Sequence, residues 1–292
     1  MYRLRVFSYS RCLLFFAVSL SLPTNVRPCE HYVFSGCNSQ WQYCGCDVPA
    51  VNLSAIPLNA TVIELGDRHS WTGLCTPSCL LDTFAPLPHR HNVTKVRLYN
   101  IWAAPNDRPF PVARFLLNVR STLKFLTLSR IFLPRITRGT FAGMTALRGL
   151  ALAANRMSAI DADAFSVVDG RSDLPQLIRL SITYNNITML DWNVFKPLTR
   201  SVETIDLTNN NIQRIFLSGF FVSHIVEVVD LTNNPNLTSI DDSFLRSIHR
   251  ASRWPRPYLG LRETPLCSSV AQCPRITKIY GPLEDCCRDT AG

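Results

Sequence analysis

Apolar and polar positions recur along residues 93–247 in one template, L-x-x-L-x-L-x-x-N-x-L. Its alternating apolar positions predict a short strand, and its asparagine predicts a turn after the strand. Successive copies start 24 to 30 residues apart, the period of a repeat built from stacked coils. The copies contain Leu147, Leu150, Leu152, Asn155 and Met157; Leu177, Leu180, Ile182, Asn185 and Ile187; Val202, Ile205, Leu207, Asn210 and Ile212; Val226, Val229, Leu231, Asn234 and Leu237; Leu123, Leu126, Leu128, Ile131 and Leu133; and Val93, Val96, Leu98 and Ile101.

A column of phenylalanines runs in step with this template. Each lies ten residues after the asparagine position of its copy. Two columns in the same register predict that successive coils stack, with both columns inside a continuous core. The column contains Phe141, Phe165, Phe195, Phe220 and Phe244.

The asparagine position explains the segment TIDLTNNNIQRI, which places three asparagines in a row at residues 209–211. An inward asparagine side chain offers two donors and an acceptor to backbone groups of its own coil and its neighbour. Asn210 is therefore predicted to be buried, with Asn209 and Asn211 pointing outward. The alternative is a surface loop of three polar turn residues. The predicted ladder is Asn155, Asn185, Asn210 and Asn234.

These motifs resemble the extracellular leucine-rich repeat family with flanking cysteine caps, from Cys29 to Ser247. The resemblance implies an α/β solenoid, a right-handed curved coil with a concave parallel β-sheet and an irregular or short-helical convex side. It also implies binding of proteins or glycans on the concave face. The caps depart from the family, because Val48 stands near an expected cysteine and the motif N-P-W-x-C-D-C is absent. The segment KIYGPLEDCC also looks like the end of glycoprotein-hormone-type receptor ectodomains, so a receptor fragment remains an alternative.

The first 22 residues read as a secretory signal peptide. Arg3, Arg5 and Arg11 precede the apolar run from Cys12 to Leu22. This run is shorter than the roughly 20 residues that a bilayer-spanning helix needs. Its removal lowers the formal charge from +9 to +6, since it contains three arginines and no acidic residue. We therefore expect a secreted, extracellular protein without a membrane span.

Ten cysteines remain and lie only toward the two ends, as expected for disulfide-stapled caps in an oxidising compartment. The predicted divisions are a cap at 29–65, an insertion with a degenerate repeat at 66–92, repeats at 93–247, and a basic linker with a cysteine-rich tail at 248–292. A zinc site at the first four cysteines is the alternative. Adjacent Cys286 and Cys287 are predicted to pair with Cys267 and Cys273 rather than with each other. The cysteines are Cys29, Cys37, Cys44, Cys46, Cys75, Cys79, Cys267, Cys273, Cys286 and Cys287.

Side chains between the aliphatic strand positions face the concave side, because side chains alternate along a strand. They are basic in the N-terminal copies and acidic in the C-terminal ones, which predicts a polarised surface for an extracellular protein partner. Ordinary solvated charges are the alternative. The predicted contact residues are Lys95, Arg97, Lys124, Phe125, Arg148, Arg179, Tyr184, Glu203, Asp206, Glu227 and Asp230. Five predicted N-glycosylation sites avoid this face: Asn52, Asn59, Asn92, Asn186 and Asn236.

Glycosaminoglycan binding and catalysis are two further classes of function to compare with the sequence. A basic run after the repeats, with Arg246, His249, Arg250, Arg253, Arg256 and Arg262, predicts either a glycosaminoglycan-binding segment of a matrix protein or a solvated linker. Signatures of an enzyme are missing, including the nucleophile elbow, the zinc-protease helix and the phosphate-binding glycine loop. His89 and His91 have no third ligand nearby in the sequence, so an exposed loop is expected there. Hence no catalysis, cofactor, metal or nucleic-acid partner is predicted.

Overall fold

The computed structural model describes residues 32–35, 40–44, 56, 58–65, 79–80, 86–99, 101–102, 109–166, 172–218, 225–249, 258–269, 271–280 and 286. Several predictions fall outside these residues: the signal peptide, the glycosylation site at Asn52 and the basic residues Arg250, Arg253 and Arg256. The same holds for Cys29, Cys37, Cys46, Cys75 and Cys287.

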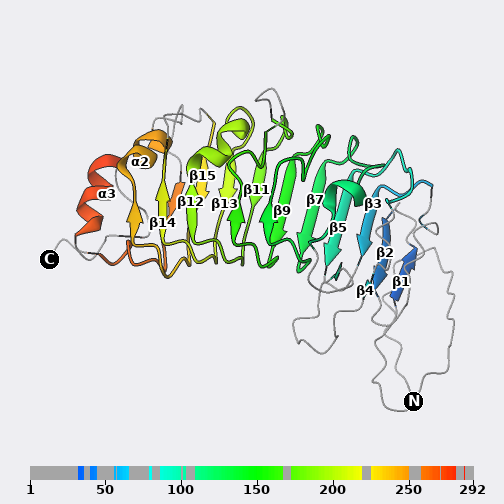
Figure 1. Cartoon of the computed structure of the whole chain (residues 1–292), viewed down its shortest axis with the longest axis horizontal. Helices are drawn as coiled ribbons and strands as arrows, with labels where there is room; N and C mark the ends of the chain where they lie inside the picture. Colours follow the sequence, from blue (N-terminus) through cyan, green and yellow to red (C-terminus); the bar gives the residue numbers. More distant parts are fainter. Residues whose placement is uncertain are drawn as a thin grey trace, which may run out of the picture.

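One large sheet runs the length of the described chain, with its strands side by side (Figure 1). It has 10 strands among the described residues, and they are arranged in sequence order from β1 at one end to β17 at the other. The pairing is parallel throughout, except that β1 runs antiparallel to β2. In order, the strands are β1 (Tyr32–Ser35), β2 (Gln40–Cys44), β3 (Val62–Leu65), β5 (Lys95–Tyr99), β7 (Phe125–Ser129), β9 (Gly149–Ala153), β11 (Arg179–Ser181), β13 (Thr204–Asp206), β15 (Val228–Asp230) and β17 (Tyr258–Gly260).

The aliphatic positions of the template form the core beneath this sheet. In β9, Leu150 and Leu152 are buried while Gly149, Ala151 and Ala153 alternate with them on the more open side. The register keeps equivalent residues adjacent, so Leu150 pairs with its counterparts in β7 and β11. Each coil thus buries its apolar edge against two neighbours.

A second set of short strands lies on the return side of the coil, after the turn that ends each main strand. The sequence analysis expected only irregular or short helical structure there. Regular spacing of the coils also aligns these return segments, which lets them pair in parallel. The strands are β4 (Cys79–Leu80), β6 (Ile101–Trp102), β8 (Arg135–Ile136), β10 (Ala159–Ile160), β12 (Met189–Asp191), β14 (Arg214–Phe216) and β16 (Ser239–Ile240).

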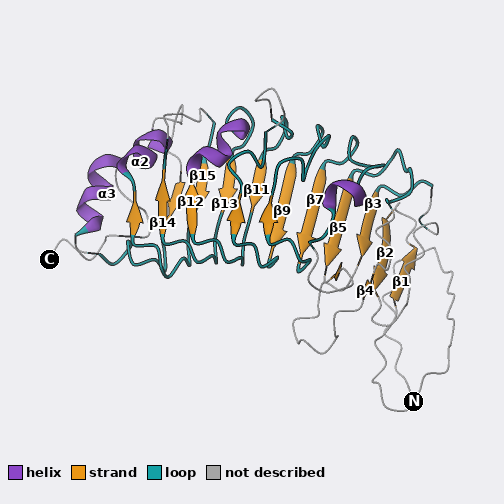
Figure 2. Ribbon diagram, in the orientation of Figure 1, coloured by secondary structure: helices purple, strands orange, loops and turns teal. Residues whose placement is uncertain are grey.

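Most of the helices lie along one edge of the row of strands, opposite the edge of tight turns, whereas α3 lies at the C-terminal end of the row (Figure 2). They are short, as the sequence predicts. Within the described residues, none is long and apolar enough to cross a membrane. The helices are α1 (Val112–Phe115), the 3-10 helix η2 (Trp192–Leu198), α2 (Asp242–His249) and α3 (Gln272–Tyr280).

The phenylalanine column forms a stack through the core. The ring centroids of Phe141 and Phe165 lie 6.3 Å apart, and those of Phe165 and Phe195 lie 6.1 Å apart. Trp192 then makes edge contacts with Phe195 at 4.9 Å and with Phe244 at 4.7 Å. All these rings are buried, so the column joins successive coils as the sequence predicts. Phe220 lies outside the described residues.

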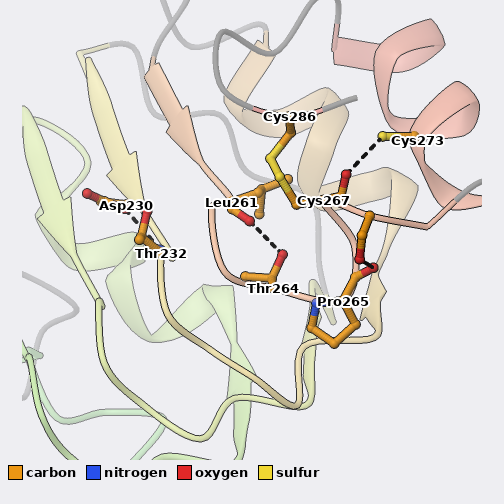
Figure 3. Close-up of a disulfide and its surroundings, with 9 residues drawn as sticks. Asp230, Thr232, Leu261, Thr264, Pro265, Cys267, Cys273 and Cys286 are labelled. Atoms are coloured by element: carbon orange, nitrogen blue, oxygen red, sulfur yellow. Dashed lines mark hydrogen bonds between the residues drawn. A yellow bond between two sulfur atoms is a disulfide. The ribbon is translucent and has the colours of Figure 1, made fainter. Parts of the chain in front are cut away.

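The repeats extend one coil beyond the predicted end at residue 247. Strand β17 pairs with β15, and Leu259, Leu261 and Leu266 are buried at template positions. Thr264 stands where the asparagine belongs, and its hydroxyl donates to the carbonyl of Leu261 at 2.7 Å (Figure 3). This coil was not predicted, because its sequence carries threonine in place of the asparagine and two prolines before the strand.

The C-terminal end is closed by helices and a disulfide. Arg275 of α3 donates to the Asp242 carboxylate of α2 at 2.5 Å and to the carbonyl of Ile240 at 2.6 Å. Cys267 and Cys286 form a disulfide (Figure 3), and Cys267 is one of the two partners predicted for Cys286. Cys273 is also disulfide-bonded, and its pairing with Cys287 stays a prediction.

Asp173 is a buried carboxylate at the base of the segment between β10 and β11. Burial raises its pKa above the usual value of 3.8, and the charge of Arg138 partly opposes this. Because the folded-state pKa is raised, the ionised carboxylate destabilises the fold above that pKa, and protonation relieves the cost as pH falls through it. We expect Asp173→Asn to raise the urea midpoint at pH 7, with a smaller gain at acidic pH. Equal midpoints at pH 7 would contradict this.

Candidate binding surface

Three rows of side chains cross the open face of the large sheet. The first row precedes the strands and is joined by backbone hydrogen bonds from coil to coil, as from Arg148 N to Lys124 O at 2.8 Å and from Glu227 N to Glu203 O at 2.7 Å. The second and third rows alternate with buried residues within the strands. The first row is Lys124, Arg148, Ile178, Glu203 and Glu227; the second is Val62, Lys95, Phe125, Gly149, Arg179, Thr204, Val228 and Tyr258; the third is Glu64, Arg97, Thr127, Ala151, Ser181, Asp206, Asp230 and Gly260.

The charges of the first row reverse along the sheet. Lys124 and Arg148 are exposed in the coils of β7 and β9, and Glu203 and Glu227 are exposed in the coils of β13 and β15. No hydrogen bond or ion pair within the described residues occupies these four side chains. They are therefore available to charges on another molecule.

Charged side chains of the third row form an ion pair and hydrogen bonds within the protein. Arg97 donates to Glu64 at 3.1 Å, and Glu64 is buried. Glu64 is not among the contact residues predicted from the sequence, although it occupies the position in β3 that Arg97 occupies in β5. Arg97 therefore contributes less free positive charge to the surface than the sequence suggests.

The third-row aspartates are held in the same way. Asp206 accepts hydrogen bonds from Thr208 N at 3.0 Å and from the Ser181 hydroxyl at 3.2 Å. Asp230 accepts one from Thr232 N at 3.0 Å. These carboxylates shape the turns after β13 and β15 as well as adding negative charge.

Tyr184 does not belong to the rows, which corrects its predicted position on the concave strands. It lies three residues beyond β11, in the turn, with φ of 55° and 57% of its surface exposed. Equivalent residues of other coils share this left-handed conformation. They are Arg130, Ala154, Asn209, Asn233 and Glu263, which with Tyr184 form the turn row.

The turn row answers why residues 209–211 are all asparagine. Asn209 takes the left-handed conformation, which asparagine tolerates better than most residues. Its amide donates to Thr232 O in the next coil at 3.1 Å, and the Asn210 side chain then turns inward. Asn211 lies outside the core and accepts a hydrogen bond from the side chain of Asn236. Each of the three therefore has a different role.

A ladder of asparagine side chains fastens consecutive coils inside the turn row. Asn155 donates to Leu128 O and accepts from Ile131 N, both at 2.9 Å and both in the preceding coil. Asn185, Asn210 and Asn234 likewise reach back to carbonyls of the coil before them. Their donor bonds run to Leu152 O at 2.9 Å, Ile182 O at 2.7 Å and Leu207 O at 3.1 Å, respectively.

The chain folds as a leucine-rich repeat solenoid. The decisive observation is that the ladder and the parallel sheet occur in the same register, one asparagine and one strand for each coil. Among the residues that the structure describes, the first-row charges without a partner lie beside the strands on the open side of this solenoid.

Comparisons with known proteins find similar solved structures only at low sequence identity. No protein-family description and no curated protein matches the chain. Human 5T4 (Wnt-activated inhibitory factor 1, trophoblast glycoprotein) is 18% identical with a TM-score of 0.42, over 64% of this chain and 76% of 5T4. A chain of the Drosophila Toll–Spatzle complex is 16% identical with a TM-score of 0.42, over 75% of this chain and 31% of that one. A chain of the TLR13–ssRNA13 complex is 18% identical with a TM-score of 0.46, over 76% of this chain and 32% of that one.

The predicted glycosylation sites lie away from the three rows. Asn59, Asn92, Asn186 and Asn236 are all exposed. Asn59 and Asn92 directly precede the first buried position of neighbouring coils, whereas Asn186 and Asn236 follow the ladder turn.

The remaining candidates contribute little to a site. Arg246 and Arg262 are exposed, and the rest of the predicted basic run lies outside the described side chains. His89 and His91 are exposed on a loop that Arg90 anchors by donating to Ile56 O at 2.6 Å. A search of the described residues finds no cluster of histidine, cysteine or carboxylate side chains arranged for a metal ion.

Proposed function

We propose that this leucine-rich repeat protein is exported and binds a protein partner through the open face of its large sheet. The observation that carries the proposal is the reversal of charge along the first row, where four exposed side chains have no partner among the described residues. A partner of opposite polarity would be steered to this face and held in one orientation. The role is binding rather than catalysis.

Two further observations support an extracellular setting. The disulfide between Cys267 and Cys286 is of a kind that persists in oxidising compartments. The exposed glycosylation sites flank the open face without covering it. Both features suit a protein whose sheet meets another protein outside the cell.

The test is a charge-reversal variant with Lys124→Glu, Arg148→Glu, Glu203→Lys and Glu227→Lys. These positions are exposed and unpaired in the described structure, and the net charge is unchanged. We expect at least about a tenfold loss of affinity for partners captured by the wild-type protein. Like charges facing each other across an interface cost several kcal/mol, and about 1.4 kcal/mol corresponds to a factor of ten.

The matched control reverses four charges away from the three rows: Arg114→Glu, Lys196→Glu, Asp163→Lys and Glu263→Lys. All four side chains are exposed. Partners are identified by quantitative mass spectrometry after capture from extracellular fluid, and affinities are measured on the purified pairs. Circular dichroism checks that both variants fold. Unaltered affinity in the first variant, or an equal loss in both variants, would refute the proposal.

A further inference from the structure

Phe125 is an exposed aromatic residue in the middle of the second row. Its surface is 45% exposed although it lies within strand β7. The Lys95 ammonium lies 5.1 Å from the ring centroid, within range of a cation–π interaction. Aromatic residues, phenylalanine included, are enriched at protein–protein interfaces relative to the rest of the protein surface.

Gly149 provides the space into which this ring leans. A Cβ atom at Gly149 would lie 3.0 Å from Cδ1 of Phe125 and 3.5 Å from Cε1. Any side chain there would push the ring away, so glycine at this point keeps the ring low over β9. The adjacent third-row residues of β7 and β9, Thr127 and Ala151, are also small. The result is a shallow floor of small residues beside an exposed aromatic ring.

Positive charge surrounds this floor. Lys95 precedes it on β5, Lys124 and Arg148 border it in the first row, and Arg179 follows in the second row. Lys124, Arg148 and Arg179 are exposed. The surroundings favour an apolar side chain that has carboxylates beside it. We call the Phe125 ring, Gly149, Thr127 and Ala151 the aromatic cradle.

A uniform polyanion fits the whole face poorly. Acidic side chains follow in the coils of β13 and β15, only a few strands from the cradle. They are Glu203, Asp206, Glu227 and Asp230. Nucleic acid or a glycosaminoglycan that covered both ends would meet this negative charge. A polypeptide can carry both signs within a short segment and is therefore the better match.

The strand spacing sets the length of that segment. Neighbouring strands lie about 4.8 Å apart, so the three to four strand intervals between β7 and β13 or β15 span about 14–19 Å. An extended peptide advances about 3.3 Å per residue. About four to six residues therefore separate a group bound at the cradle from one bound at the acidic end.

We infer that the aromatic cradle anchors an apolar side chain flanked by acidic residues, in an extended segment of a partner protein that carries basic residues about four to six positions away. This inference rests on the proposed function and specifies its partner. Phe125 supplies the apolar contact, and the surrounding lysines and arginines select the acidic flanks. Glu203 and Glu227 receive the basic residues and fix the direction of the segment.

The experiment selects binders to the full chain from a displayed library of random peptides about 12 residues long, which exceeds the expected span. We expect enrichment of sequences with acidic residues around an apolar one and basic residues about four to six positions away. A synthetic peptide with the enriched sequence is then titrated by fluorescence anisotropy. Failure to enrich such a pattern would overturn the inference.

The variants are Phe125→Ala, Gly149→Ala and, as the matched control, Tyr184→Ala, which removes an exposed aromatic ring outside the sheet. We expect Phe125→Ala to weaken peptide binding about tenfold or more, and Gly149→Ala to weaken it by less. The control should stay within about twofold of wild type. Unchanged binding by Phe125→Ala, or an equal loss in the control, would overturn the anchor. If protein capture still depended on the first-row charges, the broader proposal would stand without it.

Discussion

Replacement of Phe165 by alanine is expected to lower the free energy of unfolding by about 3–5 kcal/mol, the range for truncating a buried phenylalanine. The ring is fully buried and stacks between Phe141 and Phe195, so its removal leaves a cavity bordered by three coils. The neighbouring coils cannot close the gap without losing the register of their own hydrogen bonds. Denaturant unfolding followed by circular dichroism measures the change.

The control for Phe165 is Phe125, which has the same side chain on the other side of the sheet. It is 45% exposed and contributes mainly surface contacts. Its truncation should cost no more than about 1 kcal/mol, since only part of a buried side chain's transfer free energy is lost. Similar losses for the two variants would show that the phenylalanine column does not organise the core.

Asn155→Leu is expected to lower stability by about 2–6 kcal/mol. Leucine has nearly the right size but leaves the carbonyl of Leu128 and the amide of Ile131 without their partner, and each unpaired buried group costs about 1–3 kcal/mol. The Asn155 side chain is fully buried, so water does not replace it. The measurement is again denaturant unfolding.

Amide hydrogen exchange adds a local signature for the same variant. The amide of Ile131 should lose protection, because its acceptor is the Asn155 side chain. The matched control is Asn186→Ala, at an exposed asparagine of the next coil, which should change stability by less than about 0.5 kcal/mol. An Asn155 variant as stable as this control would mean that the ladder hydrogen bonds contribute nothing.

Much of this architecture could be predicted because its physical requirements repeat. The aliphatic spacing locates the strands, as for Leu150 and Leu152 in β9, since a coil must bury one edge against its neighbours. The fold class and the phenylalanine column follow from the same register. The alternation within each strand also predicts that Lys95 and Phe125 occupy equivalent positions on adjacent strands.

Features that depend on single contacts could not be predicted. Threonine at residue 264 forms one of the hydrogen bonds that an asparagine would form. The last coil therefore lacks the asparagine by which the other coils are recognised. The burial of Glu64 beneath Arg97 depends on how two coils approach each other. Tyr184 was assigned to the strand because the sequence does not reveal where the left-handed turn begins.

The turn row has a consequence for how this protein can diversify. Its left-handed backbone is held by hydrogen bonds from backbone amides to carbonyls of the next coil, as from Ala154 N to Thr183 O at 3.0 Å, and not by glycine. Arginine, alanine, tyrosine, asparagine and glutamate all occupy the row. Since main-chain hydrogen bonds carry the constraint, residue types as different as these can occupy the turn row without disturbing the winding of the solenoid.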